Sequence, residues 1–224
     1  MKSKPLIIFG IGQVSEILTF YLNKMGRKIF CYCVDDNYFK KTVFKGKKVI
    51  TTKQLYKKFK PKDINLHIAM SYKDMNNFRE KKFLDFKKKG YFLESFINNK
   101  KLYNSHHKIG QNCFIIDSHI QPFAKIYDNV YVWSGSVIGH HSTIKSHSWI
   151  SSGTAIGGNS KILNNSFLGM NTTVGHFVKI DKESFVAAGS TITKDVKKNS
   201  VVIQEESKKL NFSARDFMKI SNIK

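Results

Sequence analysis

Two short segments near the start of the chain have residue types that suit a bound nucleotide. Gly10-Ile11-Gly12-Gln13 follows one apolar run, and Asp35-Asp36 follows another. Glycines at a strand-to-helix turn let backbone N–H groups approach a phosphate or ribose, and an acid after the second strand can accept from a ribose hydroxyl. The full G-x-G-x-x-G pattern is absent, because Ser15 occupies the third glycine position. A tight turn without a ligand is therefore the alternative.

Histidine is the other residue type with catalytic potential. An unperturbed imidazole changes its protonation near neutral pH, so it can accept a proton from a nucleophile. A solvated or structural role is the alternative for any one of them. The chain has eight: His67, His106, His107, His119, His140, His141, His147 and His176.

The elements that would position the glycine turn form a strand–turn–helix–strand unit. The apolar run 6–9 predicts a buried parallel strand, a helical pattern follows from Val14 to Leu22, and 29–34 predicts a second strand. Further patterns predict a helix at 53–58, a strand at 66–70, a helix at 74–88 and a strand at 91–97. This alternation predicts an α/β domain over residues 1–100 with a small Rossmann-like parallel sheet.

A repeat of six residues dominates the second half of the chain. Such a period matches neither an α-helix nor a flat strand, and it is typical of a β-helix. A chance run of aliphatic residues in a β-sandwich explains so many unbroken repeats poorly. Every sixth residue is aliphatic: Ile120, Ile126, Val132, Ile138, Ile144, Ile150, Ile156, Ile162, Leu168, Val174, Ile180, Val186 and Ile192. The positions four further on are small or β-branched, such as Ser136, Ser142 and Thr154.

The composition indicates a cytoplasmic protein with a lysine-rich, solvated surface. The net charge is +22, yet the arginines are only Arg27, Arg79 and Arg215, and no basic stripe interleaved with aromatic residues is present. Nucleic-acid readout favours arginine, so we expect no nucleic-acid partner. The positive electrostatic field of these lysines would still attract anionic nucleotides or coenzyme A. Three cysteines without a C-x-x-C pair suit a reducing compartment, and no apolar run is long enough to span a membrane.

Three motifs in the repeat carry a family resemblance: Ile138-Gly139-His140-His141-Ser142, the segment 166–171 (SFLGMN) and the segment 186–192 (VAAGSTI). With the small sheet domain, they resemble the hexapeptide-repeat sugar acyltransferases. That family includes bacillosamine- and perosamine-type nucleotide-sugar N-acetyltransferases and sialic acid O-acetyltransferases. The resemblance covers the chain from Ile7 to about Val196. It implies an all-β left-handed parallel β-helix at 101–196, three hexapeptides per coil, a homotrimer, and a separate C-terminal tail at 197–224.

The resemblance also assigns site residues. With eighteen residues per coil, His140, Gly158 and His176 would stack in one column. The position of His140 is that of the family's general base, and the Gly158 N–H would face the thioester carbonyl. The match further suggests acetyl-CoA contacts at Trp149, Met170, Ala188 and Gly189. Nucleotide-sugar contacts would be Gly12, Gln13, Asp35, Asp36 and Ser71.

Two departures from the family pattern stand out. His141 replaces a glutamate that orients the base in bacillosamine-type relatives. The common Gly-x-Pro-Ala-Lys element is also missing, and the segment 203–207 (IQEES) stands in its place. Leu210, Phe212 and Phe217 would let a short tail helix within 208–224 pack on a neighbour.

The resemblance implies an acetyl-CoA-dependent N-acetyltransferase that acts on the amino group of a nucleotide-linked deoxyamino sugar, for surface polysaccharide or glycan biosynthesis. A sugar O-acetyltransferase with the same base is the alternative, although an amine needs less activation than a hydroxyl. A metal-dependent hydratase of the γ-carbonic-anhydrase type would need two histidines five positions apart, and no pair has that spacing. A non-catalytic scaffold would leave the glycine turn and His140 without a role.

Overall fold

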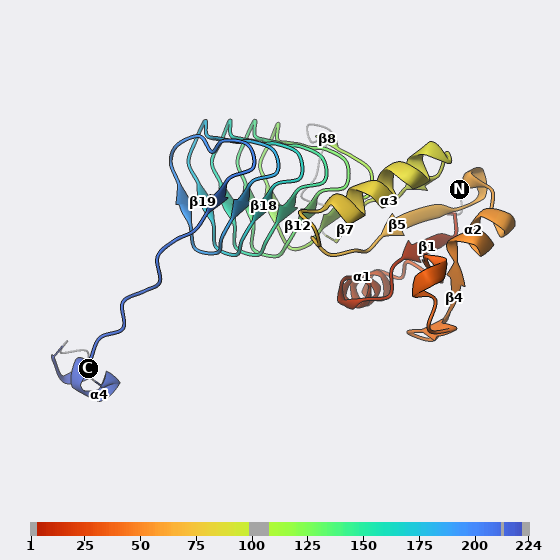
Figure 1. Ribbon diagram of the computed structural model, residues 1–224, viewed down its shortest axis with the longest axis horizontal. Helices are drawn as coiled ribbons and strands as arrows, with labels where there is room; N and C mark the ends of the chain where they lie inside the picture. The colour runs from red at the N-terminus through yellow and green to blue at the C-terminus, as the bar shows by residue number, and fades with distance from the viewer. Residues whose placement is uncertain (1–3, 99–107, 212, 221–224) are drawn as a thin grey trace.

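The computed structural model describes residues 4–98, 108–211 and 213–220. An amino-terminal α/β unit lies at one end of a long stack of parallel coils, and a tail leaves the other end (Figure 1). The boundary expected at residue 100 lies outside the described residues. None of the helices in the described ranges is long and apolar enough to cross a membrane.

The amino-terminal unit is a six-stranded sheet with the order β3-β4-β2-β1-β5-β6. β1 pairs in parallel with both β2 and β5, and only β3 runs antiparallel, against β4. Three helices flank the sheet. The elements are β1 (Leu6–Phe9), α1 (Gln13–Lys24), β2 (Ile29–Val34), β3 (Val43–Phe44), β4 (Lys47–Thr51), α2 (Thr52–Lys58), β5 (Asn65–Ile68), α3 (Asn77–Lys88) and β6 (Phe92–Leu93), with single 3₁₀ turns at Asp36–Tyr38 and Pro61–Asp63.

Two predicted elements of this unit were wrong in their bounds. The helix expected at 74–88 begins only at Asn77, because Asp74, Met75 and Asn76 all have positive φ and cannot start a right-handed helix. The strand expected at 91–97 is two strands, β6 and β7 (Phe96–Ile97). β7 joins the repeat instead of the α/β sheet, because Phe96 pairs with Phe114.

The repeat folds as a left-handed parallel β-helix of two-residue strands, and residues eighteen apart lie side by side, as Val137 and Ala155 do. Its interior is one aliphatic cluster running from Ile115 to Val196. Most of the buried serines donate to the next coil: the Ser142 hydroxyl donates to the Gly157 carbonyl at 2.9 Å, and equivalent bonds recur at Ser148 and Ser160. The buried Ser190 hydroxyl has no such partner among the described residues. The strands are β8 (Lys108–Ile109), β9 (Phe114–Ile115), β10 (His119–Ile120), β11 (Lys125–Ile126), β12 (Tyr131–Val132), β13 (Val137–Ile138), β14 (Thr143–Ile144), β15 (Trp149–Ile150), β16 (Ala155–Ile156), β17 (Lys161–Ile162), β18 (Phe167–Leu168), β19 (Thr173–Val174), β20 (Lys179–Ile180), β21 (Phe185–Val186), β22 (Thr191–Ile192) and β23 (Val201–Val202).

The three sheets of the β-helix differ in their outward residues, which gives the prism three chemically distinct faces. The aromatic face carries Phe96, Phe114, Tyr131, Trp149, Phe167 and Phe185. The lysine face carries Lys108, Lys125, Thr143, Lys161 and Lys179. The neutral face carries His119, Val137, Ala155, Thr173 and Thr191.

The amino-terminal unit packs on the aromatic face. One buried cluster contains Leu18 of α1 and Ile8 of β1 together with Phe114, Tyr131 and Trp149. Neighbouring rings of this face also contact one another from Phe96 to Trp149, and Phe167 and Phe185 stack at 4.7 Å. Because this contact is apolar and continuous, the two parts of the chain share a core.

The tail beyond β23 extends away from the β-helix and ends in α4 (Ala214–Ile220) (Figure 1). The predicted tail helix is therefore present, but it is shorter than the segment 208–224. Leu210 and Phe217 are about half exposed. Phe212 lies outside the described residues.

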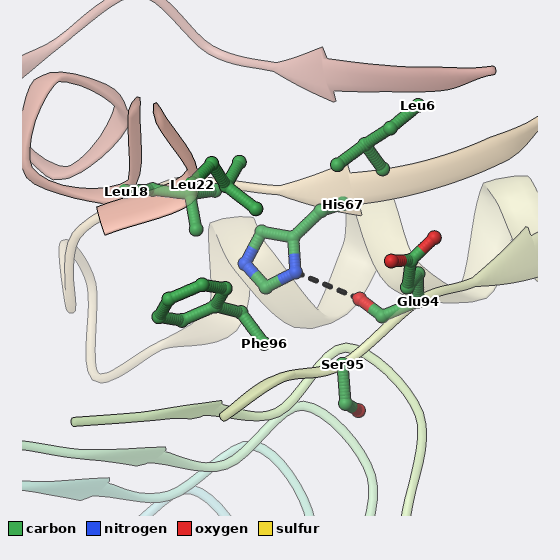
Figure 2. Close-up of a pocket in the computed structure, with 7 residues that line it drawn as sticks. All are labelled: Leu6, Leu18, Leu22, His67, Glu94, Ser95 and Phe96. Carbon is green, nitrogen blue, oxygen red and sulfur yellow. Dashed lines mark hydrogen bonds between the residues drawn. The ribbon is translucent and has the colours of Figure 1, made fainter. Parts of the chain in front are cut away.

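A small pocket between the sheet and the β-helix contains the buried His67 (Figure 2). Its Nδ1 lies 2.8 Å from the Glu94 carbonyl oxygen. A carbonyl oxygen only accepts, so Nδ1 carries a proton. Burial lowers the pKa of His67 from 6.5 to about 4, more than the Glu94 backbone contact raises it.

This burial predicts an acid-sensitive fold. Between pH 6.5 and about 4 the unfolded chain binds a proton on His67 that the folded chain does not, so stability falls as pH falls through that window. The loss of unfolding free energy due to His67 reaches about 3 kcal/mol once the pH has fallen to the folded-state pKa, from the linkage of pKa to free energy. His67→Gln should flatten the difference in unfolding free energy between pH 7 and pH 4.5 in urea titrations. Parallel pH curves for the two proteins would contradict the assignment.

Candidate functional site

His140 lies in the turn between β13 and β14, where the neutral and lysine faces meet; we call this the His140 edge. The side chain is exposed, and its backbone N–H donates to Gln121 Oε1 at 2.9 Å. The imidazole lies directly against Gly158, one coil further along. A Cβ at Gly158 would stand 2.6 Å from both Cε1 and Nε2 of His140. Only glycine leaves room for the ring in this position.

His141 contacts its neighbour through a ring nitrogen. The two Nδ1 atoms lie 3.1 Å apart, so one of them donates and the other accepts. His141 has a φ of +58°, and its ring packs against Phe123 at 4.8 Å between centroids. With Nδ1 engaged, Nε2 is the His140 nitrogen for which the structure gives no hydrogen-bond partner among the described residues.

His176 completes the expected column, because its ring centroid lies 6.5 Å from that of His140. The Gly158 N–H donates to His176 Nδ1 at 3.0 Å. The sequence-based expectation was that this N–H faces a thioester carbonyl. In this structure the donor already has a partner, so His176 would have to give way before Gly158 could serve an oxyanion.

The residues expected to contact acetyl-CoA lie elsewhere. Met170, Ala188 and Gly189 come together at the turns between the aromatic and neutral faces, which we call the Met170 edge. There the Gly189 N–H donates to the Met170 carbonyl at 2.8 Å. Within one chain the neutral face separates this edge from the His140 edge. Trp149 is buried in the aromatic face beneath Tyr72, with ring centroids 5.1 Å apart.

The residues expected to bind the nucleotide-sugar meet at one edge of the α/β sheet. Gly12 and Gln13 follow β1, Ser71 follows β5, and all three are exposed. β1 lies between β2 and β5, so this is the point where the strand order reverses, the usual ligand site of such sheets. Glycine is required at position 10 because the backbone there lies close to that of Ala69: a Cβ on Gly10 would lie 2.5 Å from the Ala69 carbonyl oxygen. The buried Ser15 hydroxyl donates to the same carbonyl at 3.3 Å.

Asp35 and Asp36 follow β2 at this same edge, and both already have partners. Asp35 Oδ1 lies 2.7 Å from Lys82 Nζ on α3. Asp36 Oδ2 accepts from the Thr52 hydroxyl at 3.0 Å. Desolvation acts to raise the pKa of Asp36, but hydrogen bonds led by that from Thr52 hold it below its ordinary value. Asp36 is therefore a fixed anion beside α2.

No role was expected for Arg79 from the sequence. This side chain from α3 is fully buried against the β-helix, and its guanidinium lies 4.2 Å from the Tyr131 ring centroid. The sequence does set this residue apart, because Arg79 is one of only three arginines in a lysine-rich chain. Glu80 of α3 links the same surfaces: it accepts from Asn165, and its Oε1 lies 3.6 Å from His147 Nε2.

Comparisons with known proteins agree with this architecture. Residues 159–194 match the bacterial transferase hexapeptide family, a motif of six repeats. No curated protein sequence matches the chain. Within the described residues, no three His, Cys, Asp or Glu side chains gather in a way that could hold a metal ion.

Several solved structures share the whole fold. An asparagine-for-histidine variant of perosamine N-acetyltransferase from Caulobacter crescentus, in complex with CoA and GDP-perosamine, is 17% identical, with a TM-score of 0.80 over 89% of this chain and 93% of that one. The acetyltransferase domain of PglB from Neisseria gonorrhoeae, in complex with acetyl coenzyme A, is 20% identical, with a TM-score of 0.79 over 93% and 100%. WeeI from Acinetobacter baumannii is 16% identical, with a TM-score of 0.74 over 89% and 96%. The chain therefore has the two-part fold of hexapeptide-repeat sugar acetyltransferases.

Proposed function

We propose that this protein is an acyltransferase that moves the acetyl group of acetyl-CoA to the amino group of a nucleotide-linked deoxyamino sugar. The observation that carries the proposal is the His140 imidazole, packed on Gly158 and tied through Nδ1 to His141 on an exposed edge of the β-helix. Its Nε2 is left to accept a proton. The similar structures that hold CoA or acetyl coenzyme A and a GDP-linked sugar support the same substrates.

The proposed step is an acyl transfer with His140 as general base. The acceptor nitrogen attacks the thioester carbonyl carbon, and Nε2 of His140 takes the proton that the nitrogen loses. The carbon–sulfur bond then breaks, and coenzyme A leaves as a thiol after regaining a proton. His141 acts as a positioning residue: it shares a hydrogen bond with Nδ1 and so fixes which nitrogen of His140 faces the acceptor.

The acceptor class follows from the surroundings of this base. Among the described residues no carboxylate is bonded to His140. For Nε2 to act as the base, Nδ1 of His140 must donate to Nδ1 of a neutral His141, which orients the base without an acid. An amine is a stronger nucleophile than a sugar hydroxyl and needs less help from a base. These points favour N-acetylation. O-acetylation of a sugar hydroxyl by the same base is the second candidate.

The nucleotide part of the acceptor would occupy the edge formed by Gly12, Gln13 and Ser71. This edge offers exposed backbone at the start of α1, which favours a phosphate group. Asp35 and Asp36 would receive ribose hydroxyls after Lys82 and Thr52 have fixed their orientation. The net charge of +22 would draw both anionic substrates to the protein.

We further propose a homotrimer. The neutral face has no lysine, although the chain as a whole carries 38 lysine and arginine residues. It exposes small residues such as Val137 and Ala155, which suit close packing between subunits. Association through this face would place the His140 edge of one subunit beside the Met170 edge of its neighbour. One acyl site would then use both edges, which a single chain keeps apart.

Charge placed on the neutral face should break this assembly. Ala155→Arg is expected to give monomers by light scattering at micromolar concentration, where the wild type gives a trimer, because an arginine would be buried without a partner. Thr143→Arg is the matched control, since it occupies the equivalent strand position on the lysine face. A monomeric wild type, or a trimeric Ala155→Arg protein, would contradict the shared site.

The activity itself is testable with acetyl-CoA and a panel of nucleotide-linked amino sugars, by following thiol release. We expect at least one amino sugar to support turnover well above hydrolysis of acetyl-CoA alone. Matched sugars with a hydroxyl in place of the amine should be poor acceptors. A preference for the hydroxyl sugars would mean that the enzyme is an O-acetyltransferase.

A further inference from the structure

The segment between β5 and α3, residues 70–76, has an unusual backbone. Asp74, Met75 and Asn76 have φ values of +52°, +46° and +67°. Three consecutive non-glycine residues in the left-handed region are costly, on the order of 1–2 kcal/mol each. Such a conformation persists only where the surrounding structure enforces it. Ser71, at the start of this loop, is part of the nucleotide edge.

One anchor of the loop is Tyr72. Its ring lies on the aromatic face, with its centroid 4.6 Å from that of Phe167 and 5.1 Å from that of Trp149. The Tyr72 carbonyl accepts from the Asn76 N–H at 3.1 Å, which closes the loop on itself. The start of the loop is thus attached to the β-helix.

The other anchor is Arg79, in the first turn of α3. Its Nη2 donates to the carbonyl oxygens of Asn129 (3.2 Å), His147 (3.0 Å) and Ser148 (3.3 Å). Its guanidinium also lies over the rings of Tyr131 and Trp149. A planar guanidinium can make these contacts together, whereas a lysine ammonium cannot stack in this way.

Among the described residues, no carboxylate pairs with the charge of Arg79. Its Nη2 donates to backbone carbonyls, and its Nε and Nη1 are buried without a partner in that part of the chain. Burial lowers the pKa of Arg79 to about 10, and the nearby Tyr131 opposes this shift. The group stays charged at neutral pH. Burying an unpaired charge costs free energy, and an aliphatic side chain could fill the same space without that cost. The arrangement therefore points to a role other than packing.

We propose that Arg79 is a positioning residue: by fixing the first turn of α3 to the β-helix, it holds the left-handed loop and thereby the Ser71 side of the nucleotide edge. This inference rests on the proposed function for its substrate, a nucleotide-sugar. Its structural part, that Arg79 holds the loop, does not depend on the substrate. Loosening this attachment should weaken binding of the nucleotide-sugar and leave acetyl-CoA binding unchanged. The Met170 and His140 edges lie elsewhere, and Trp149, which the guanidinium does contact, is buried.

The test compares Arg79→Lys with Arg27→Lys. Arg27 is a second partly buried arginine of the same unit, and it is bound to Glu94 at 2.8 Å, away from the loop. Hydrogen exchange followed by mass spectrometry should show at least tenfold faster exchange at 70–77 in Arg79→Lys, and unchanged exchange there in Arg27→Lys. In kinetics, Arg79→Lys should raise KM for the nucleotide-sugar about tenfold or more, because small misplacements at a site have large effects. The KM for acetyl-CoA should stay within about twofold.

The outcomes separate the two proposals. If exchange at 70–77 is unchanged in Arg79→Lys, the inference is wrong whatever the enzyme acts on. If exchange rises as expected but the wild type acetylates no nucleotide-sugar, the positioning role stands and the proposed function fails. Equal rises in both KM values would show a general loss of structure, which would also overturn the specific role. Thermal melting of both variants controls for global unfolding.

Discussion

Replacing His140 by alanine or asparagine is expected to lower kcat by about 10²–10⁴-fold, the usual contribution of a general base. The KM for acetyl-CoA should change little, because the imidazole faces the nucleophile and not the distant parts of the coenzyme. Steady-state kinetics with each substrate varied in turn would measure both effects.

Two neighbouring histidines provide the controls for this experiment. His141→Asn should cost less than His140→Ala, because it removes only the Nδ1 contact. His176→Ala should cost less still, and it frees the Gly158 N–H. If His140→Ala kept more than about a third of the wild-type kcat, far short of a general-base effect, His140 would not be the base. Positioning of a free amine against the thioester would then be the better explanation.

The second large effect is expected from Gly158→Ala. The three atoms nearest to an added Cβ, at 2.6 to 3.1 Å, all belong to the His140 ring. That ring is the end of an exposed side chain, so it can swing aside at little cost in stability. We expect kcat to fall by about 10²-fold, because the base is displaced from its working position. The melting temperature should change little.

A double variant makes this prediction specific. In a His140→Ala background the ring is absent, so adding Gly158→Ala should cause almost no further loss of activity. The two effects should therefore be strongly non-additive, as expected for residues in direct contact. Additive losses would instead mean that Gly158 acts through its backbone N–H or through the fold, and that the packing on His140 is incidental.

The parts of the fold that depend on local pattern could be predicted from the sequence. β1 and β2 have the expected bounds, because continuous apolar runs between turn residues leave few alternatives. The β-helix followed from a period that no other common element produces. The unbroken six-residue repeat starts only at Ile120, because Ile115 and Ile120 are five residues apart although both lie in the same core. The start of the β-helix at 101 therefore came from the family resemblance and not from the period.

The features that depend on contacts between distant segments could not be predicted. The helical pattern at 74–88 extends through Asp74 to Asn76, but the anchors at Tyr72 and Arg79 hold those residues in a left-handed conformation. Likewise, the resemblance placed His140, Gly158 and His176 in one column. It gave no sign that His176 accepts the Gly158 N–H. That bond depends on the orientation of the His176 ring, which spacing along the chain does not determine.

The most direct test is a product analysis with an isotopically labelled acetyl-CoA and one nucleotide-linked amino sugar, comparing the wild type with His140→Asn. The proposal predicts that the wild type yields a nucleotide-sugar carrying the label as an amide, seen by mass spectrometry and by the nitrogen-bound acetyl signal in NMR. The His140→Asn variant should form this product at least about 10²-fold more slowly, as for loss of a general base. Transfer of the label to a hydroxyl, or no transfer to the amino sugar by correctly folded wild-type protein, would contradict it.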